Sequence, residues 1–105
     1  MVLPSNGKLV RDRIPQVIEA SGGVPNWFVI ERELLRQALA GKLTEEVGEY
    51  LGAASEESRL EELADILEVI RGLLAEMNLS MEDLLAVADK KRAERGGFEQ
   101  GVWLA

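Results

Sequence analysis

Five carboxylates in the middle of the chain have the spacing of two rows on two helices. They are, in chain order, Glu45, Glu46, Glu49, Glu62 and Asp65. Residues three and four positions apart lie on one face of an α-helix, so Glu45 aligns with Glu49, and Glu62 aligns with Asp65. If the two segments form an antiparallel hairpin, the rows can face each other, and carboxylates that close repel unless a cation or protons neutralise them. Oxygen-only clusters of this kind suit Mg²⁺ or Mn²⁺, which keep water ligands for a phosphate substrate.

A solvated helix surface is the ordinary explanation for runs of acidic residues, and it suits the other acids of this region, Glu56, Glu57, Glu61 and Glu68. Three features favour a metal site for the two rows. They border apolar stripes, they occur on consecutive helices, and Lys42 stands beside the first row as a possible phosphate contact. Helix geometry alone does not choose between Asp65 and Glu61 as the partner of Glu62.

Two long helices are predicted to position these rows. The segment 31–54 carries an apolar stripe at helical spacing, formed by Leu35, Leu39, Leu43, Val47, Tyr50 and Ala54. The segment 60–78 carries a stronger stripe, formed by Leu60, Leu63, Leu67, Ile70, Leu74 and Met77. The polar segment 55–59 between them is predicted to be a turn, with Ser58 and Glu61 at capping-box spacing. The two helices are therefore expected to pack as an antiparallel pair.

Shorter elements are predicted on either side of this pair. Residues 1–10 are expected to form an irregular arm, and 11–20 a short helix with Pro15 in its first turn. Ser80 is predicted to cap a last helix that ends at Gly96. In the tail that follows, the Val-Trp-Leu segment 102–104 is expected to dock on an apolar surface. Together these elements predict an all-α fold, a small helical bundle in a single domain over residues 1–105.

The composition narrows the chemistry that the chain can perform. Its 105 residues include no cysteine and no histidine, so any acid–base catalysis must use carboxylates, lysines, Tyr50 or metal-bound water. The net charge of −7 disfavours duplex nucleic acid as a partner. No apolar run approaches the roughly 20 residues needed to span a bilayer, and residues 1–4 lack a signal-peptide pattern, so a soluble cytoplasmic protein is expected. Because so short a chain covers little of its own apolar surface, a homodimer or homotetramer is expected.

The acidic motifs and both ends of the chain resemble a known family. The Glu-Glu-x-x-Glu motif at 45–49 followed by Glu-x-x-Asp at 62–65 is similar to the motif of the all-α nucleoside triphosphate pyrophosphohydrolases, the MazG-like proteins. Relatives of these proteins include dimeric dUTPases and phosphoribosyl-ATP pyrophosphohydrolase. The segments 8–15 and 92–99 resemble one small MazG-like subgroup. The resemblance implies a MazG-like helical domain that hydrolyses a nucleoside triphosphate or a similar nucleotide to the monophosphate and pyrophosphate.

The resemblance also implies roles for individual residues. The implied metal ligands, for Mg²⁺ or alternatively Mn²⁺, are Glu46, Glu49, Glu62 and Asp65. Glu45 is the implied base that orients water. The implied phosphate contacts are Lys42, Lys90, Lys91, Arg92 and Arg95. The phosphoribosyl-ATP enzyme usually carries a histidine shortly after its Glu-x-x-Asp motif, and because this chain has none, a nucleotide house-cleaning role is favoured over histidine biosynthesis.

Several alternatives stay open at this level. The basic end of the last helix is also explained by compensation of the helix dipole. Packing is the simpler explanation for the three aromatic residues that could otherwise stack on a base, Trp27, Phe28 and Tyr50. Three glycines lie on one line along the first long helix, Gly41, Gly48 and Gly52. Either they allow close approach by a ligand or another backbone, or they reflect sequence drift at exposed positions. Two alternative functions are open for the whole chain. One is a catalytically silent dimerisation or regulatory module with a metal-binding acidic cluster, and the other is an antitoxin-like partner.

Overall fold

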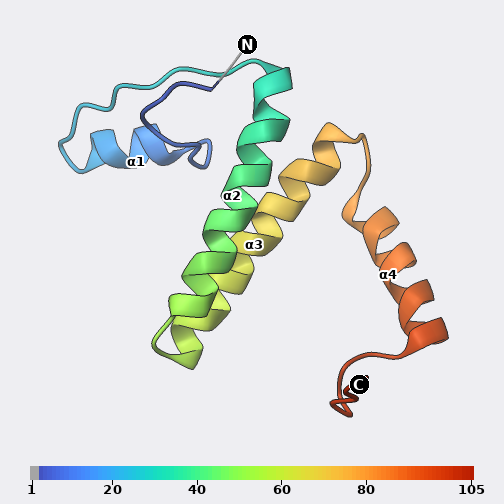
Figure 1. The fold of residues 1–105 in the computed structure, drawn as a ribbon. Coiled ribbons are helices and arrows are strands. Elements are labelled where there is room, and N and C mark those ends of the chain that lie inside the picture. The colour runs from blue at the N-terminus through green and yellow to red at the C-terminus, as the bar shows by residue number, and fades with distance from the viewer. Residues whose placement is uncertain (1–2) are drawn as a thin grey trace.

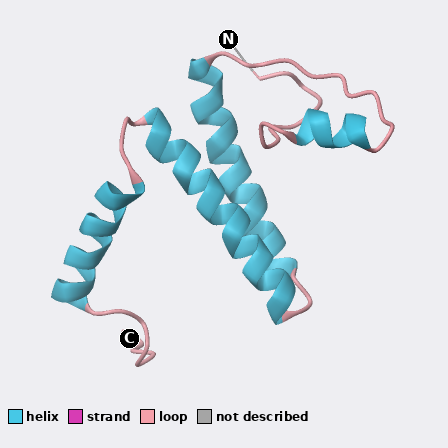
Figure 2. Ribbon diagram, turned by 180° about the vertical axis from the view of Figure 1, so that it is seen from behind, coloured by secondary structure: helices cyan, strands magenta, loops and turns pink. Residues whose placement is uncertain are grey.

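Four helices joined by loops make up the computed structural model of the protein, which describes residues 3–105 (Figure 1). They are α1 (Ile14–Ala20), α2 (Arg32–Gly52), α3 (Glu56–Glu76) and α4 (Met81–Arg95). The described residues contain no strand, as Figure 2 shows. The prediction of an all-α fold is therefore confirmed. Met1 and Val2, which begin the predicted N-terminal arm and the segment tested for a signal peptide, lie outside the described residues.

The helices α2 and α3 form the antiparallel pair on which the rest of the chain is arranged. Near the start of α2, Arg36 Nη2 donates a hydrogen bond of 3.0 Å to the carbonyl oxygen of Glu76 at the end of α3. Further along α2, the side chain of Leu39 packs on Gly72, where an added Cβ would lie only 2.9 Å from Leu39 Cδ2. Later residues of α2 thus meet earlier residues of α3, and a side chain at position 72 would displace the buried Leu39.

The turn between α2 and α3 is shorter than predicted, because Ser55 and not Ser58 caps the second helix. Ser55 is extended, with φ −145° and ψ 162°, and its hydroxyl oxygen accepts a hydrogen bond of 3.1 Å from the backbone N–H of Ser58. That geometry begins α3 at Glu56, four residues before the predicted start. The acids Glu56 and Glu57 consequently occupy the first turn, where negative charge interacts favourably with the helix dipole.

The apolar stripe predicted for the second helix faces α2 only in part. Leu39, Val69 and Leu74 are the buried apolar residues of α2 and α3. The buried and half-buried residues of α3 recur at helical spacing and include Glu62, Ile66, Val69 and Leu73. At the turn end of α3 the predicted stripe lies outside the helix pair, since three of its leucines remain 69%, 49% and 40% exposed, namely Leu60, Leu63 and Leu67. A second apolar face is therefore left uncovered.

The two outer helices begin and end close to where their sequence signals predict. Pro15 lies in the first turn of α1, which is connected to α2 by a long loop. Ser80 and Asp83 form a capping box at the start of α4: Ser80 Oγ accepts from the Asp83 N–H, and Asp83 accepts from the Ser80 N–H. The helix ends before Gly96, whose φ of 81° suits glycine.

The C-terminal part of the chain projects away from the pair. Among the helices of the described chain, α4 contacts α3 but not α2 (Figure 1). The tail residues Val102, Trp103 and Leu104 are almost fully exposed, so the described residues do not provide the apolar surface on which they were predicted to dock. None of the helices in the described part of the chain has the length and apolar character needed to cross a membrane.

Candidate functional site

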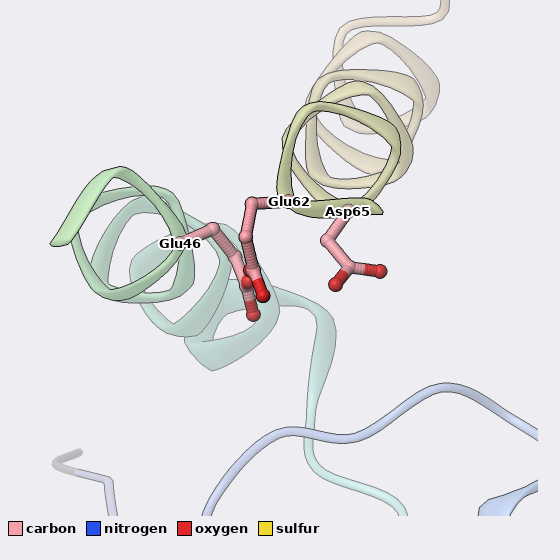
Figure 3. Close-up of side chains that lie close together, drawn as sticks. All are labelled: Glu46, Glu62 and Asp65. Carbon is pink, nitrogen blue, oxygen red and sulfur yellow. The ribbon is translucent and has the colours of Figure 1, made fainter. Parts of the chain in front are cut away.

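The structure brings together three carboxylates from the two facing helices. They form what we call the acidic cluster, Glu46, Glu62 and Asp65. One oxygen of each lies within 4.8 Å of one oxygen of the others, and Figure 3 shows the side chains converging from α2 and α3. Antiparallel packing produces this arrangement, because it places the middle of α2 opposite the first half of α3. The geometry also selects Asp65 over Glu61, which is exposed and takes no part in the cluster.

The electrostatics of the cluster show a surplus of negative charge. Glu46 is only 8% exposed, and its one ion-pair partner in the described chain, Lys42 Nζ, is 3.4 Å away and lies equally close to Glu45. Burial raises the pKa of Glu62, and a hydrogen bond with the Glu46 carboxyl and the charges of Asp65, Glu46 and Glu49 raise it further. A carboxyl group whose ionised form is disfavoured by its neighbours indicates a place where added positive charge would be stabilising.

An open groove of about 460 Å³ runs beside the acidic cluster. Its lining residues are Glu45, Gly48, Glu49, Gly52, Ala53, Ser58 and Glu62. Glu49 thus lies in the groove wall next to the cluster and is not one of the three converging carboxylates. Apart from the neighbouring residues of α2 itself, no described atom lies within 4 Å of a Cβ built on Gly41, Gly48 or Gly52, so no other backbone of the described chain approaches that glycine line. At Gly48 and Gly52 the missing side chains leave the groove open.

The predicted phosphate contacts of the last helix are not brought to the acidic cluster within this chain. Lys90, Lys91, Arg92 and Arg95 occupy the C-terminal end of α4, which does not contact α2. Three of them line a separate depression of about 890 Å³ together with the segment 96–99. There the Arg92 guanidinium donates to the Glu99 carboxylate and lowers its pKa. Of the predicted phosphate contacts, only Lys42 lies beside the cluster.

The aromatic residues that could stack on a base do not line the groove. Trp27 and Phe28 lie in the loop before α2 and are more than half exposed. Tyr50 is half-buried on α2. A base-binding surface is therefore not formed by these three side chains in the described chain.

One contact of the site was not predicted from the sequence. Arg11 Nη2 lies 2.6 Å from Asp65 Oδ1, which places an arginine from the N-terminal arm directly on the acidic cluster. The two residues are 54 positions apart, so helical spacing carries no signal of their contact. The only indication in the sequence was that Arg11 falls within the 8–15 segment that resembles the MazG-like subgroup.

The donor set fits a hard divalent cation. The acidic cluster offers oxygen ligands only, from side chains close enough to share one ion, and it is incompletely neutralised by Lys42 and Arg11. Mg²⁺ and Mn²⁺ prefer such ligands and retain water for a phosphate group. The adjoining groove is large enough for a small molecule that would approach the ion.

Comparison with known proteins gives one match. A model of the family described as phosphoribosyl-ATP pyrophosphohydrolase matches residues 24–92. The matched segment includes α2, α3 and the acidic cluster, and it excludes Arg11 and the segment 95–99. No match was found among curated proteins or solved structures.

Proposed function

We propose a function on the premise that this chain belongs to the phosphoribosyl-ATP pyrophosphohydrolase family, to which the match over residues 24–92 assigns it. Family membership supports a hydrolase that splits a nucleotide and releases pyrophosphate. Our proposal is that the reaction depends on Mg²⁺, with Mn²⁺ as a substitute. The bond cleaved is the anhydride between the α- and β-phosphates, and the products are a nucleoside monophosphate and pyrophosphate.

The observation that carries this proposal is the convergence of Glu46, Glu62 and Asp65 beside an open groove. These residues would hold the metal, with Glu49 in the groove wall as the fourth predicted ligand. When bound, the metal would polarise phosphoryl oxygens and lower the pKa of an attacking water. A polyphosphate could not otherwise enter a groove with this concentration of negative charge.

Two residues of α2 are proposed to handle the proton and the substrate charge. Glu45 lines the groove one residue before the buried ligand Glu46, and its side chain is 44% exposed, so one of its carboxylate oxygens can accept a proton from water there. Lys42 Nζ lies 3.4 Å from the Glu45 carboxylate. It therefore holds the base in place and adds a positive charge for a phosphate oxygen.

The proposed substrate is a nucleoside triphosphate or a related nucleotide, and the proposed role is removal of unwanted nucleotides. The absence of histidine from the sequence supports this role over the histidine-biosynthetic reaction of the family's namesake. Such nucleotides are found inside the cell, so a cytoplasmic location is part of the proposal.

We further propose that the protein functions as a homodimer or a larger homo-oligomer. Its radius of gyration is 17.2 Å, whereas a compact chain of this length is expected near 13 Å. The apolar face left open on α3 (Leu60, Leu63 and Leu67) is of the kind that marks an interface. Light scattering at micromolar concentration should give at least twice the monomer mass, and Leu63→Asp should reduce it. A monomeric parent would contradict this part of the proposal.

The reaction is tested with a panel of nucleoside triphosphates, including non-canonical bases, in the presence of Mg²⁺. Pyrophosphate and orthophosphate are measured separately, and chelation of the metal is the control. Pyrophosphate together with the monophosphate is the expected product pattern. Stepwise release of orthophosphate would overturn the proposed reaction, and no release from any nucleotide would favour the silent module.

A further inference from the structure

The N-terminal arm makes a contact with the acidic cluster that the helix pair does not need for its own packing. Arg11 Nη2 donates a hydrogen bond of 2.6 Å to Asp65 Oδ1. The backbone of Arg11 is fixed at the entrance to α1, where its carbonyl oxygen accepts from the N–H of Ile14 at 3.0 Å. The arm therefore presents the guanidinium at the edge of the cluster, and in Figure 3 the N-terminal chain passes below the three carboxylates.

This ion pair contributes little to the stability of the fold. The Arg11 side chain is 57% exposed and that of Asp65 is 41% exposed. Exposed pairs of this kind are screened by solvent and contribute little to stability. A structural role is therefore a weak explanation for an arginine held against a candidate metal ligand.

The guanidinium retains most of its hydrogen-bonding capacity. An arginine has five N–H donors arranged in a planar fork that matches phosphate oxygens. In the described chain Arg11 uses a single donor, toward Asp65. The remaining donors are free to bind an anion without breaking that contact.

The charge distribution around the cluster shows why such a donor matters. The basic residues of α4 do not reach the cluster, and among the described residues only Lys42 and Arg11 form ion pairs with it. Lys42 is already shared between Glu45 and Glu46. Of these two described cations, Arg11 therefore keeps the larger share of uncommitted donors for a polyphosphate at the metal.

We propose that Arg11 is a phosphate-binding residue of the site, which bridges Asp65 and the polyphosphate of the bound nucleotide. The inference rests on the proposed function and adds to it a residue that lies outside the family match. It makes the N-terminal arm part of the substrate site: the arm carries a charged donor to a cluster formed otherwise by α2 and α3 alone.

The proposal predicts opposite effects on two ligands. In the free protein Arg11 repels a cation and occupies one Asp65 oxygen, so Arg11→Ala should tighten Mg²⁺ binding, by about two- to tenfold at low salt. At saturating Mg²⁺ the same substitution should weaken binding of inorganic pyrophosphate by about tenfold or more, because a charge-assisted bidentate contact is lost. If Arg11 only supported the fold, its replacement would weaken the binding of both Mg²⁺ and pyrophosphate.

The experiment compares four proteins by titration calorimetry, first with Mg²⁺ and then with pyrophosphate at saturating Mg²⁺. They are the parent, Arg11→Ala, Arg11→Lys and the control Arg13→Ala, which removes the same charge two residues away, where the described residues form no ion pair. Arg11→Lys should restore Mg²⁺ affinity to the parent value and recover only part of the pyrophosphate affinity, since lysine keeps the charge without the fork. Arg13→Ala should match the parent in both titrations.

Three results would overturn the assignment. They are unchanged pyrophosphate affinity in Arg11→Ala, an equal loss of affinity for Mg²⁺ and for pyrophosphate in that variant, and a parent that fails to bind pyrophosphate at saturating Mg²⁺. These titrations involve no turnover, so the proposed reaction is judged separately. A parent that binds pyrophosphate through Arg11 but hydrolyses no nucleotide would refute the reaction and keep the phosphate site.

Discussion

Replacing Glu62 by glutamine should raise the stability of the metal-free protein and remove most of the stabilisation that metal provides. Glu62 stands between Glu46 and Asp65, and burial, hydrogen bonding and three neighbouring charges all raise its pKa. A carboxyl whose pKa is raised in the folded state contributes stability below its unfolded pKa, near 4.5, and that contribution is lost as the pH rises through the folded pKa. At pH 7.5 the ionised group is therefore unfavourable, and the neutral amide of Glu62→Gln should raise Tm.

The expected stabilisation by bound metal follows from its concentration relative to its dissociation constant. Metal at one hundred times its dissociation constant stabilises the folded state by about 2.7 kcal/mol. For a domain of this length that corresponds to a rise in Tm of roughly 10 °C or more. If loss of one carboxylate ligand weakens metal binding about a hundredfold, the same metal concentration contributes only about 0.4 kcal/mol, or roughly 2–3 °C.

The assay is thermal unfolding followed by circular dichroism at pH 7.5, with and without Mg²⁺ or Mn²⁺. Glu61→Gln is the matched control, since it makes the same change on the neighbouring, exposed residue of α3. It should show the parent's metal-induced rise. A Glu62→Gln protein that keeps the full metal response would place the metal elsewhere, and a lower metal-free Tm would refute the view that the carboxylates crowd one another.

Three further perturbations test the catalytic, core and capping arguments. Glu45→Gln should lower kcat by about 10²-fold or more because the base is lost, while the metal-induced rise in Tm stays; a drop in both would make Glu45 a ligand. Leu39→Ala should destabilise the α2–α3 pair by about 2–5 kcal/mol, measured by urea unfolding, since Leu39 is buried against Gly72; a loss under 1 kcal/mol would mean that the pair is held mainly by other contacts. Hydrogen bonds with Ser80 lower the pKa of Asp83, so the ionised carboxylate stabilises the fold above the ordinary pKa near 3.8, and this stabilisation is lost as the pH falls through the lowered pKa. Asp83→Asn should therefore flatten the acid dependence of Tm below about pH 4. An unchanged dependence of Tm on pH would contradict the capping box as the source of this stabilisation.

The helices and the candidate chemistry of the site were predicted from local features of the sequence. Helical periodicity predicted two long helices, and the serine at 80 and the glycine at 96 located the ends of α4, because caps and backbone preferences act within a few residues. The spacing of the acids placed two rows on consecutive helices. The missing cysteine and histidine left carboxylates and metal as the most plausible chemistry.

The start of α3 shows where local signals compete. Two serines near the turn could each cap the helix, and the capping-box spacing favoured Ser58. In the structure Ser55 is the extended residue whose hydroxyl oxygen accepts from the Ser58 N–H, so α3 begins four residues earlier than predicted. Both choices satisfy the local hydrogen-bonding rules, so the sequence pattern alone did not distinguish them.

Only the tertiary structure decided which acids meet and what else reaches them. The rotation of α3 against α2 turns Val69 inward, leaves Leu60 and Leu63 outside, and brings Asp65 rather than Glu61 to Glu46. That rotation depends on how the side chains of the two helices pack into each other, so it cannot be predicted from the spacing of the acids on one helix. The contact of Arg11 with Asp65 joins residues 54 positions apart through a loop and a short helix. Periodicity carries no information across such a connection, because only the folded path of the chain determines where the arm passes.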